Sequence, residues 1–488
     1  MYKYYSIPQY LFFILVAIVY IFYQSQFEIS FDGALYIKQA YFFSINENKI
    51  ALELHNWPFF SFIISLLQKL FSFSLINAAR IINGALFLIS CLYFFRILQM
   101  ISNQRNVILY GFLIIVSSIP LLDDYLPMLL RDTGSWAGFL GGTYYFMRWI
   151  KTKSFFDCCL FQVGFFIGFL FRIEVLICLI FLPFLGIYLN KQSPKKYLYF
   201  FQSYIFLIIV FLISLIIINY NHEFNSLFHS SINRFHEIIN APLRIIREFF
   251  YPLPIYSNNL DLTIQLNENK LITKFSLLFA IVLISWFSTV TLFHFLTAYV
   301  ALKYKLISSK FNLLLLNIFS ITFLIPCLFE FSSFDTSGRY WILNIWIVYI
   351  YSAVGLGFCF NYIEKFRLKN KKWLSGFLWV VMVIYLLIVF IDISPKKSYS
   401  KTLFWMQSNK IDFNAIYTND VRIDVFSIGY NYPYQKKDIK FLVLNNNISP
   451  EYLQSKEFQH YVKTKHIKLL KNIPSNDKSD FSIYILED

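Results

Sequence analysis

The sequence predicts a polytopic α-helical membrane protein with about eleven membrane spans and a small C-terminal α/β domain outside the cytoplasm. The chain of 488 residues is 57% hydrophobic and 15% charged, so it carries more apolar surface than soluble cores of that size can bury. Because lipid offers no hydrogen-bond partner to the backbone, apolar runs of membrane-crossing length are expected to be helices. Clear examples are residues 8–23, 199–218, 275–300 and 373–391.

The connections between successive predicted spans are alternately rich in basic and in acidic residues. Every second connection is basic: Arg96 and Arg105; Arg148, Lys151 and Lys153; Lys191, Lys195 and Lys196; Lys303, Lys305 and Lys310; Lys365, Arg367, Lys369, Lys371 and Lys372. The intervening connections hold Asp32, Asp123, Asp124, Asp132, Glu174 and Asp335. By the positive-inside rule, we expect a multi-pass protein of the bacterial inner (plasma) membrane with a cytoplasmic N-terminus and an external C-terminus. This topology accounts for the net charge of +15, and no nucleic-acid partner is expected.

Residues 1–393 form the predicted membrane domain, and residues 394–488 form a soluble domain in which polar and charged residues become dense. Four short β-type runs predict a sheet in the soluble domain, and a helix is expected to open at Ser449, where a capping residue is followed by proline. Strands mixed with helical stretches are typical of a small α/β domain with an at least partly parallel sheet. The runs are 415–417, 439–444, 467–470 and 481–486.

Two long external connections, residues 24–75 and 219–274, interrupt the series of short loops. In the first, the run from Trp57 to Phe71 mixes polar positions into an apolar stretch, which predicts a helix in the membrane interface or a buried re-entrant segment. The second carries three histidines at seven-residue spacing. Metal ligation uses tighter spacing, so an interfacial helix near lipid phosphates is the preferred interpretation of His222, His229 and His236.

Acidic residues in the external connections are the first candidates for chemistry. The carboxylate of Asp32, soon after the first span, could take a proton from an acceptor, hold a divalent cation, or only cap a helix. Asp123, Asp124 and Asp132 lie with Arg131 in a later connection. Carboxylates from the two connections could meet in one site, or Arg131 and Asp132 could only satisfy each other.

Two arginines are candidates for holding an anionic lipid headgroup, because guanidinium presents a planar fork of donors that suits phosphate. Arg172 and Glu174 mark either the outer turn of a tight hairpin or a buried functional pair. Arg339 and Tyr340 occupy a short external turn. Arginines that only anchor helix ends are the competing interpretation.

Taken together, these motifs resemble the GT-C superfamily of membrane glycosyltransferases, in particular its branch of protein O-mannosyltransferases and lipid A aminoarabinose transferase (glycosyltransferase family 39-like). The resemblance covers most of the membrane domain and rests on the order and sidedness of short motifs. These are Phe31-Asp32-Gly33 with Tyr36, His55-Asn56-Trp57-Pro58, Asn77-Ala78-Ala79-Arg80, Arg131-Asp132, Gly168-Phe169-Leu170-Phe171-Arg172 and Gly338-Arg339-Tyr340.

The resemblance implies a GT-C-like fold and the transfer of a sugar from a polyprenyl-phosphate carrier to an acceptor at the outer face of the membrane, with inversion at the anomeric carbon. It implies no certain cofactor and leaves a divalent cation, Mg or Mn, open. The implied site residues are Asp32 as catalytic base or its positioning partner, Asp132 or Asp124 as second acid, Arg172, Arg339 and Tyr340 at the carrier phosphate, and Tyr36, His55, Arg131 and Glu174 as further members.

The implied partners are the lipid-linked sugar donor, the bilayer, and an acceptor that is a glycan, a lipid or a protein. Two alternatives use the same carriers. A flippase or transporter of lipid-linked glycans would show internal repeats and broken spans near the bilayer midplane. An O-antigen ligase or polymerase would depend on His222, His229 and Arg234 rather than on Asp32.

Overall fold

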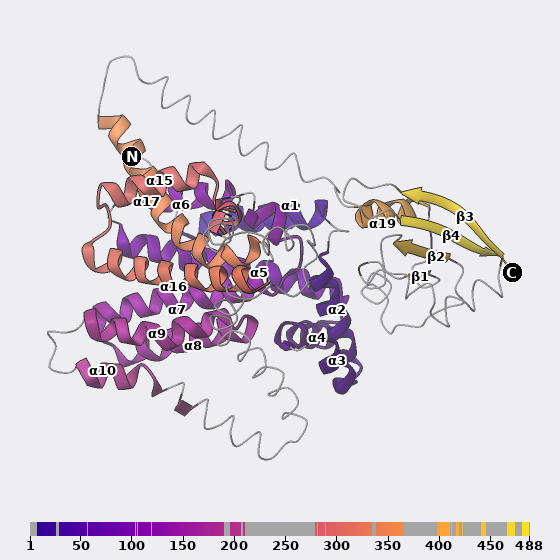
Figure 1. Ribbon diagram of the computed structural model, residues 1–488, viewed down its shortest axis with the longest axis horizontal. Helices are drawn as coiled ribbons and strands as arrows, with labels where there is room; N and C mark the ends of the chain where they lie inside the picture. Colours follow the sequence, from indigo (N-terminus) through magenta and orange to yellow (C-terminus); the bar gives the residue numbers. More distant parts are fainter. Residues whose placement is uncertain are drawn as a thin grey trace, which may run out of the picture. The chain divides into compact units, whose positions relative to one another are not determined.

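The computed structural model is mostly helical over the residues that it describes (Figure 1). Chain contacts divide it into two compact units: unit 1 with residues 1–14, 86–120 and 132–386, and unit 2 with residues 15–85, 121–131 and 387–488. The structure describes residues 7–25, 29–55, 57–102, 104, 106–118, 120–189, 196–205, 208–209, 279–280, 282–287, 289–333, 338–365, 398–409, 411, 416–418, 422, 441–445, 466–473 and 481–487.

The described part of the chain contains these elements. Helices α1 (Ile7–Gln24) and α5 (Leu75–Ile101) contribute residues to both units. Unit 1 further contains α6 (Val107–Val116), α7 (Asp132–Thr152), α8 (Phe155–Phe171), α9 (Glu174–Leu189), α10 (Lys196–Gln202), α15 (Leu292–Lys303), α16 (Ser309–Ser333), the 3₁₀ helix η2 (Gly338–Trp341) and α17 (Ile342–Lys365). Unit 2 further contains α2 (Phe31–Ser44), α3 (Asn48–Leu54), α4 (Phe59–Phe71) and α19 (Ser398–Ser408), the strands β1 (Ile416–Thr418), β2 (Phe441–Asn445), β3 (His466–Ile473) and β4 (Phe481–Glu487), and most of the π-helix η1 (Pro120–Tyr125).

Helix α17 is the centre of unit 1. Residues 341–357 are all buried, and α17 packs against α6, α7, α15 and α16. A helix that is covered on every side has to be apolar on every side, as its sequence is. Its Trp346 ring lies 6.3 Å from Trp136 of α7 and 5.4 Å from Phe94 of α5, so the core between these helices is aromatic.

Helices α7 and α8 run side by side (Figure 1) and approach each other through glycines. A Cβ atom on Gly138 would lie 2.2 Å from the backbone nitrogen of Gly168, and one on Gly164 would lie 2.6 Å from that of Gly142. Small residues let helix backbones approach closely, and this spacing of glycines is a feature of helix pairs in membranes.

Two helices in the described part of the chain are long and apolar enough to cross a membrane, Leu75–Ile101 and Ile342–Tyr362. The remaining apolar helices there are shorter, with 10–17 residues. The prediction of about eleven spans is therefore not confirmed. Much of the run 199–218 and all of the run 373–391 lie outside the described residues.

The predicted span over residues 275–300 is broken in the structure. Val290 and Thr291 are not helical, and α15 begins only at Leu292. Hydroxyl side chains offer the backbone bonds that compete with a continuous helix: Thr289 Oγ1 donates to the carbonyl of Ser285 (2.8 Å). The run of β-branched residues also lowers helix propensity, a local effect that average hydropathy does not register.

The first long connection is not a loop but a group of three helices. Helix α2 packs on both α3 and α4. The helix predicted after Trp57 is present as α4, with Pro58 at its N-cap and Ser72 closing it in a left-handed conformation. Its buried positions include Ser61, Ser65 and Gln68.

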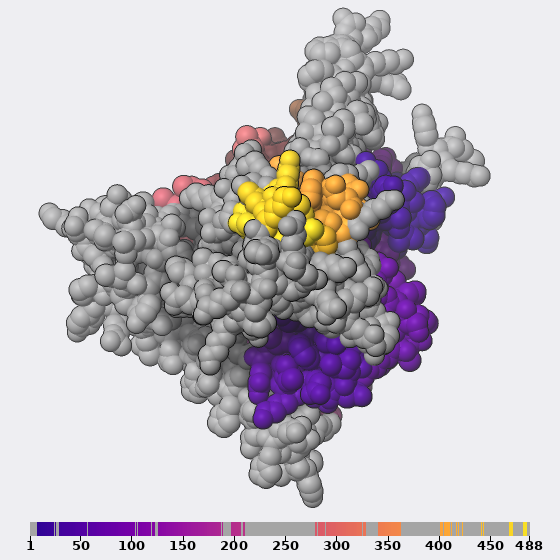
Figure 2. Space-filling model, turned by 90° about the vertical axis from the view of Figure 1, so that its right-hand side faces the viewer, coloured from indigo at the N-terminus to yellow at the C-terminus, as the bar shows by residue number. Residues whose placement is uncertain are grey.

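The C-terminal strands form a sheet of order β1-β2-β4-β3. Strands β1 and β2 are parallel, whereas β4 pairs antiparallel with both β2 and β3. The strands lie at the four runs that the sequence predicts, and helix α19 packs on β3 and β4 (Figure 2). The helix expected from Ser449 lies outside the described residues, as do the histidines of the second connection.

Replacing Gly138 with alanine should destabilise the protein by about 1–3 kcal/mol, because the added Cβ meets helix backbone that cannot move aside. Unfolding of the purified protein, followed by circular dichroism, measures this. Gly141→Ala is the matched control: its Cβ would lie 3.0 Å from the Tyr93 ring, a side chain that can shift, and alanine favours the helix. Equal stability of the two variants would contradict the close packing of α7 on α8.

Candidate functional site

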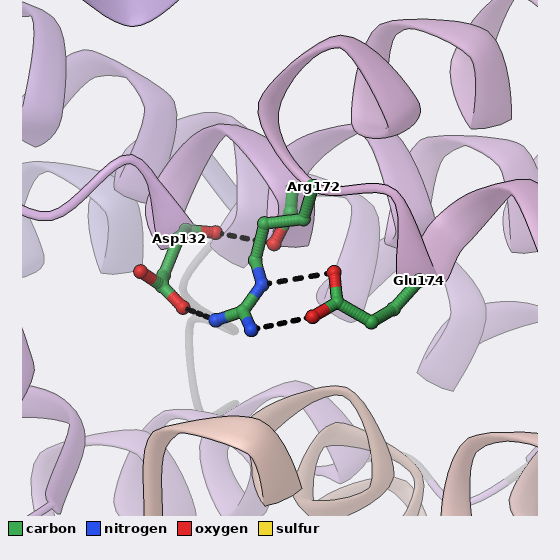
Figure 3. A network of polar contacts seen from close by, with 4 residues as sticks. Asp132, Arg172 and Glu174 are labelled. Carbon is green, nitrogen blue, oxygen red and sulfur yellow. Dashed lines mark hydrogen bonds and ion pairs between the residues drawn. The ribbon is translucent and has the colours of Figure 1, made fainter. Parts of the chain in front are cut away.

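Three charged side chains meet where α7 begins and where α8 passes into α9. The guanidinium of Arg172 contacts the carboxylate of Asp132 through Nη1, and it contacts Glu174 through both Nε (3.1 Å) and Nη2 (2.7 Å). Asp132 approaches from one side and Glu174 from the other (Figure 3). We call Asp132, Arg172 and Glu174 the Arg172 triad, and it belongs wholly to unit 1.

Asp132 and Arg172 are buried, Glu174 is partly exposed, and the Arg172 triad carries a formal charge of −1. The side chain of Arg172 is 7% exposed and that of Asp132 is 3% exposed. Burial alone would lower the pKa of Arg172, but the attraction of Asp132 and Glu174 outweighs it and holds the pKa well above its usual value. The guanidinium is therefore a permanent cation whose forked donors are engaged by two carboxylates.

The turn between α8 and α9 also contacts the Gly338-Arg339-Tyr340 motif. The Cζ atom of Arg172 lies 4.8 Å from the ring of Tyr340 in η2, a cation–π distance. The sequence pattern left open whether Arg172 and Glu174 mark the outer turn of a hairpin or a buried functional pair; in the structure the two residues are paired at the turn between α8 and α9, and a functional role stays a prediction. The side chains of Arg339 and of Asp124, in η1, are outside the described part of the chain, so their predicted roles stay predictions.

Arg131 and Asp132 do not satisfy each other, contrary to one alternative from the sequence. Asp132 pairs with Arg172, whereas the contacts of Arg131 are with aromatic rings.

A second group of candidate residues surrounds Tyr36 in unit 2. The Cζ atom of Arg131 lies 5.8 Å from the ring of Tyr36 and 5.9 Å from that of Trp57, and the ring of His55 stands edge-on to Tyr36 at 5.2 Å. We call Tyr36, His55, Trp57 and Arg131 the Arg131 cluster. Arg131 as a whole is partly exposed, yet its Nη1 atom is buried and donates no hydrogen bond to any residue that the structure describes.

Backbone contacts bring the segment before Arg131 to the start of α2. Ser30 caps α2 by accepting a bond from Gly33 N (2.8 Å), and its hydroxyl donates to the carbonyl of Met128 (3.0 Å). A Cβ on Gly33 would lie 2.5 Å from that carbonyl oxygen, so only glycine fits after Asp32. Asn83 of α5 holds the same segment by donating to the carbonyl of Leu126 (2.8 Å).

His55 is held in one orientation. The backbone N–H of Trp57 donates to its Nδ1 (3.0 Å), so Nδ1 is an acceptor and the proton of the neutral ring is on Nε2. Gln39 of α2 donates to the carbonyls of Ala51 and His55 (2.8 Å each), which ties α2 to the end of α3. The imidazole is thereby fixed beside Tyr36.

Asp32 lies in the first turn of α2 and is partly exposed. The N-cap is Ser30, so Asp32 is not the capping residue that the sequence offered as an alternative. A carboxylate in the first turn interacts favourably with the helix dipole, and position 32 lies one turn before Tyr36 on the same face of α2. Asp32 belongs to unit 2 and Asp132 to unit 1, so their convergence stays a prediction.

Trp57 is the member of the Arg131 cluster that the sequence did not single out as a site residue; it was expected only to begin a helix in the membrane interface or a buried re-entrant segment. Its place in the His55-Asn56-Trp57-Pro58 motif was the available signal. In the structure Trp57 is buried and contacts Arg131. A cation beside the tryptophan could not be assigned from the sequence, because Arg131 lies far along the chain.

Among the described residues, no group of three or more His, Cys, Asp or Glu side chains is placed to hold a metal ion. The carboxylate of Asp132 is already paired with the guanidinium of Arg172, so Asp132 is poorly suited to bind a metal cation. No protein-family model matches the chain, and no curated protein matches it.

Asp132→Asn should destabilise the protein by about 3 kcal/mol, because it leaves buried Arg172 with one carboxylate fewer. Asp157→Asn is the matched control: Asp157 is equally buried, but its partner Arg148 is 41% exposed and can return to water, so a loss of about 1 kcal/mol or less is expected. Denaturant unfolding of both variants checks this. Equal losses would show that the Arg172 triad is no more costly to break than a half-exposed pair.

Proposed function

We propose that the chain is a membrane-embedded glycosyltransferase that moves a sugar from a polyprenyl-phosphate donor to an acceptor at the outer face of the membrane. The proposal takes the two long apolar helices as spans and the shorter ones as spans or parts of spans. It takes the Arg131 cluster together with Asp32 as the catalytic region.

The faces of α4 support a membrane setting. Its buried face mixes Phe60 and Ile64 with the polar Ser61, Ser65 and Gln68, while Phe62 and Leu70 are 50% and 66% exposed. In water a surface helix exposes its polar face. An exposed apolar face is stable where the surroundings are apolar, as at the acyl boundary of a bilayer.

The observation that carries the proposed activity is the convergence on Tyr36. Three stretches that form the family resemblance, Phe31-Asp32-Gly33 with Tyr36, His55-Asn56-Trp57-Pro58 and Arg131-Asp132, each supply a residue to one region of unit 2. The carboxylate-bearing helix α2, the imidazole of His55 and the guanidinium of Arg131 therefore lie in the same part of unit 2. Such a set is what transfer from an anionic donor needs.

In the proposed reaction, Asp32 accepts the proton of an acceptor hydroxyl or amine as that group attacks the anomeric carbon. A bond forms from the acceptor to the carbon, and the bond from the carbon to the phosphate oxygen breaks. The phosphate leaves with the electron pair, on the face opposite to the attack, which inverts the anomeric configuration. Charge grows on the leaving phosphate, so a nearby cation stabilises the transition state more than the ground state.

Asp32→Asn should reduce transfer at least about a hundredfold, because the amide cannot accept the proton. Purified protein is reconstituted with radiolabelled polyprenyl-phosphate sugars, and label reaching the acceptor is counted. Glu53→Gln is the matched control, since it removes a negative charge from the exposed side of α3 in the same unit. Full transfer by the Asp32 variant would exclude this mechanism, and label that crosses the bilayer without being transferred would favour the flippase alternative.

A further inference from the structure

We propose that Arg131, held between Tyr36 and Trp57, is the group that binds the phosphate of the ligand, and that Arg172 is not. The inference that this phosphate is carried on a lipid donor rests on the proposed function. The inference that Arg131 binds a phosphate rests on the contacts of the two arginines alone.

The two arginines differ in the charge around them. Arg172 is bonded to Asp132 and Glu174, so its positive charge is already exceeded by two negative ones. An incoming phosphate would meet a net negative group there and would have to displace a carboxylate. Among the residues whose side chains the structure describes, the contacts of Arg131 are with neutral rings, so no described carboxylate there competes with an anion for its positive charge.

The rings also prepare Arg131 for binding. A free arginine side chain has many rotamers, and ordering it on binding weakens affinity. Tyr36 and Trp57 already confine the guanidinium, and their rings give it a less polar surface than water on those sides. Phosphate that reaches this guanidinium would meet forked donors in a fixed direction, in surroundings that strengthen the attraction.

The second observation is that the Nη1 atom of Arg131 is buried and has no hydrogen-bond partner among the described residues. A buried donor on a charged group normally has a hydrogen-bond partner, because leaving it without one is costly. In the described part of the chain Nη1 has none, whereas the donor groups of Ser30, Asn83 and Gln39 in unit 2 have theirs. The acceptor Oε1 of Gln39 also has no partner there. An oxyanion bound at the partly exposed guanidinium would supply this partner.

Arg148 provides an internal comparison. Its Cζ atom also lies over two rings, 5.8 Å from Tyr144 and 5.7 Å from Tyr145, but it pairs with Asp157. Arg148 therefore shares the aromatic contacts of Arg131 and lacks its unneutralised charge. Replacing Arg148 removes the same kind of contact without removing the proposed site.

The test measures binding of radiolabelled polyprenyl phosphate to the full-length protein in nanodiscs. Arg131→Gln should weaken binding about tenfold to a hundredfold, the loss expected for charge-assisted hydrogen bonds. Arg131→Lys should bind with intermediate affinity, because ammonium keeps the charge without the fork. Arg148→Gln should bind like the wild type.

If Arg131→Gln fails to fold, the phosphate site can still be tested on the wild-type protein by displacing the bound radiolabelled polyprenyl phosphate with unlabelled competitors. Unlabelled polyprenyl phosphate should displace the label, whereas polyprenol, which lacks the phosphate, should not. Equal displacement by polyprenol, or undiminished binding by folded Arg131→Gln, would overturn the phosphate site. Displacement by inorganic phosphate at the same concentration would overturn the lipid donor as the ligand and assign the site to free phosphate.

Failure here is distinguishable from failure of the proposed function. If Asp32→Asn kept full transfer while Arg131→Gln lost polyprenyl phosphate, the proposed base would be excluded and the phosphate site would stand. If Asp32→Asn lost transfer while Arg131→Gln bound polyprenyl phosphate normally, the phosphate site would be excluded and the proposed base would stand.

Discussion

The buried guanidinium of Arg172 is the constraint around which unit 1 is arranged. It links the first residue of α7 to the first residue of α9 at the end of α8, and so fixes three helix ends at one point. A buried cation tolerates neither the loss of a carboxylate nor a wide separation from it. The glycine contacts between α7 and α8 are compatible with this anchoring, because both require the two helices to be close along their length.

The same residue type serves a different purpose in unit 2. Arg131 is confined by rings instead of carboxylates, so its position is fixed while its charge remains uncompensated by the residues described around it. A structural arginine needs its charge neutralised within the fold, and a binding arginine needs it left for the ligand. The distinction between the two lies in their partners and not in their own chemistry.

Much of the local structure follows from the sequence. The helix after Trp57 and the β-type runs of the C-terminal sheet were both predicted, because they depend on neighbouring residues. Tyr36, His55 and Arg131 could be named as site residues from their motifs. The break of the helix at Val290 and Thr291, within the predicted span 275–300, was not predicted, because hydropathy averages over such a local interruption.

By itself, the sequence determined that this chain is dominated by apolar helices and which polar residues deserve study. Only the tertiary structure decided which arginine is paired with carboxylates and which contacts aromatic rings instead. Asp132 and Arg172 are 40 positions apart, and Ser30 and Met128 are 98 apart, so no local pattern specifies either pairing. Such contacts form when whole helices pack, because the positions of both partners are set by the burial of many other side chains.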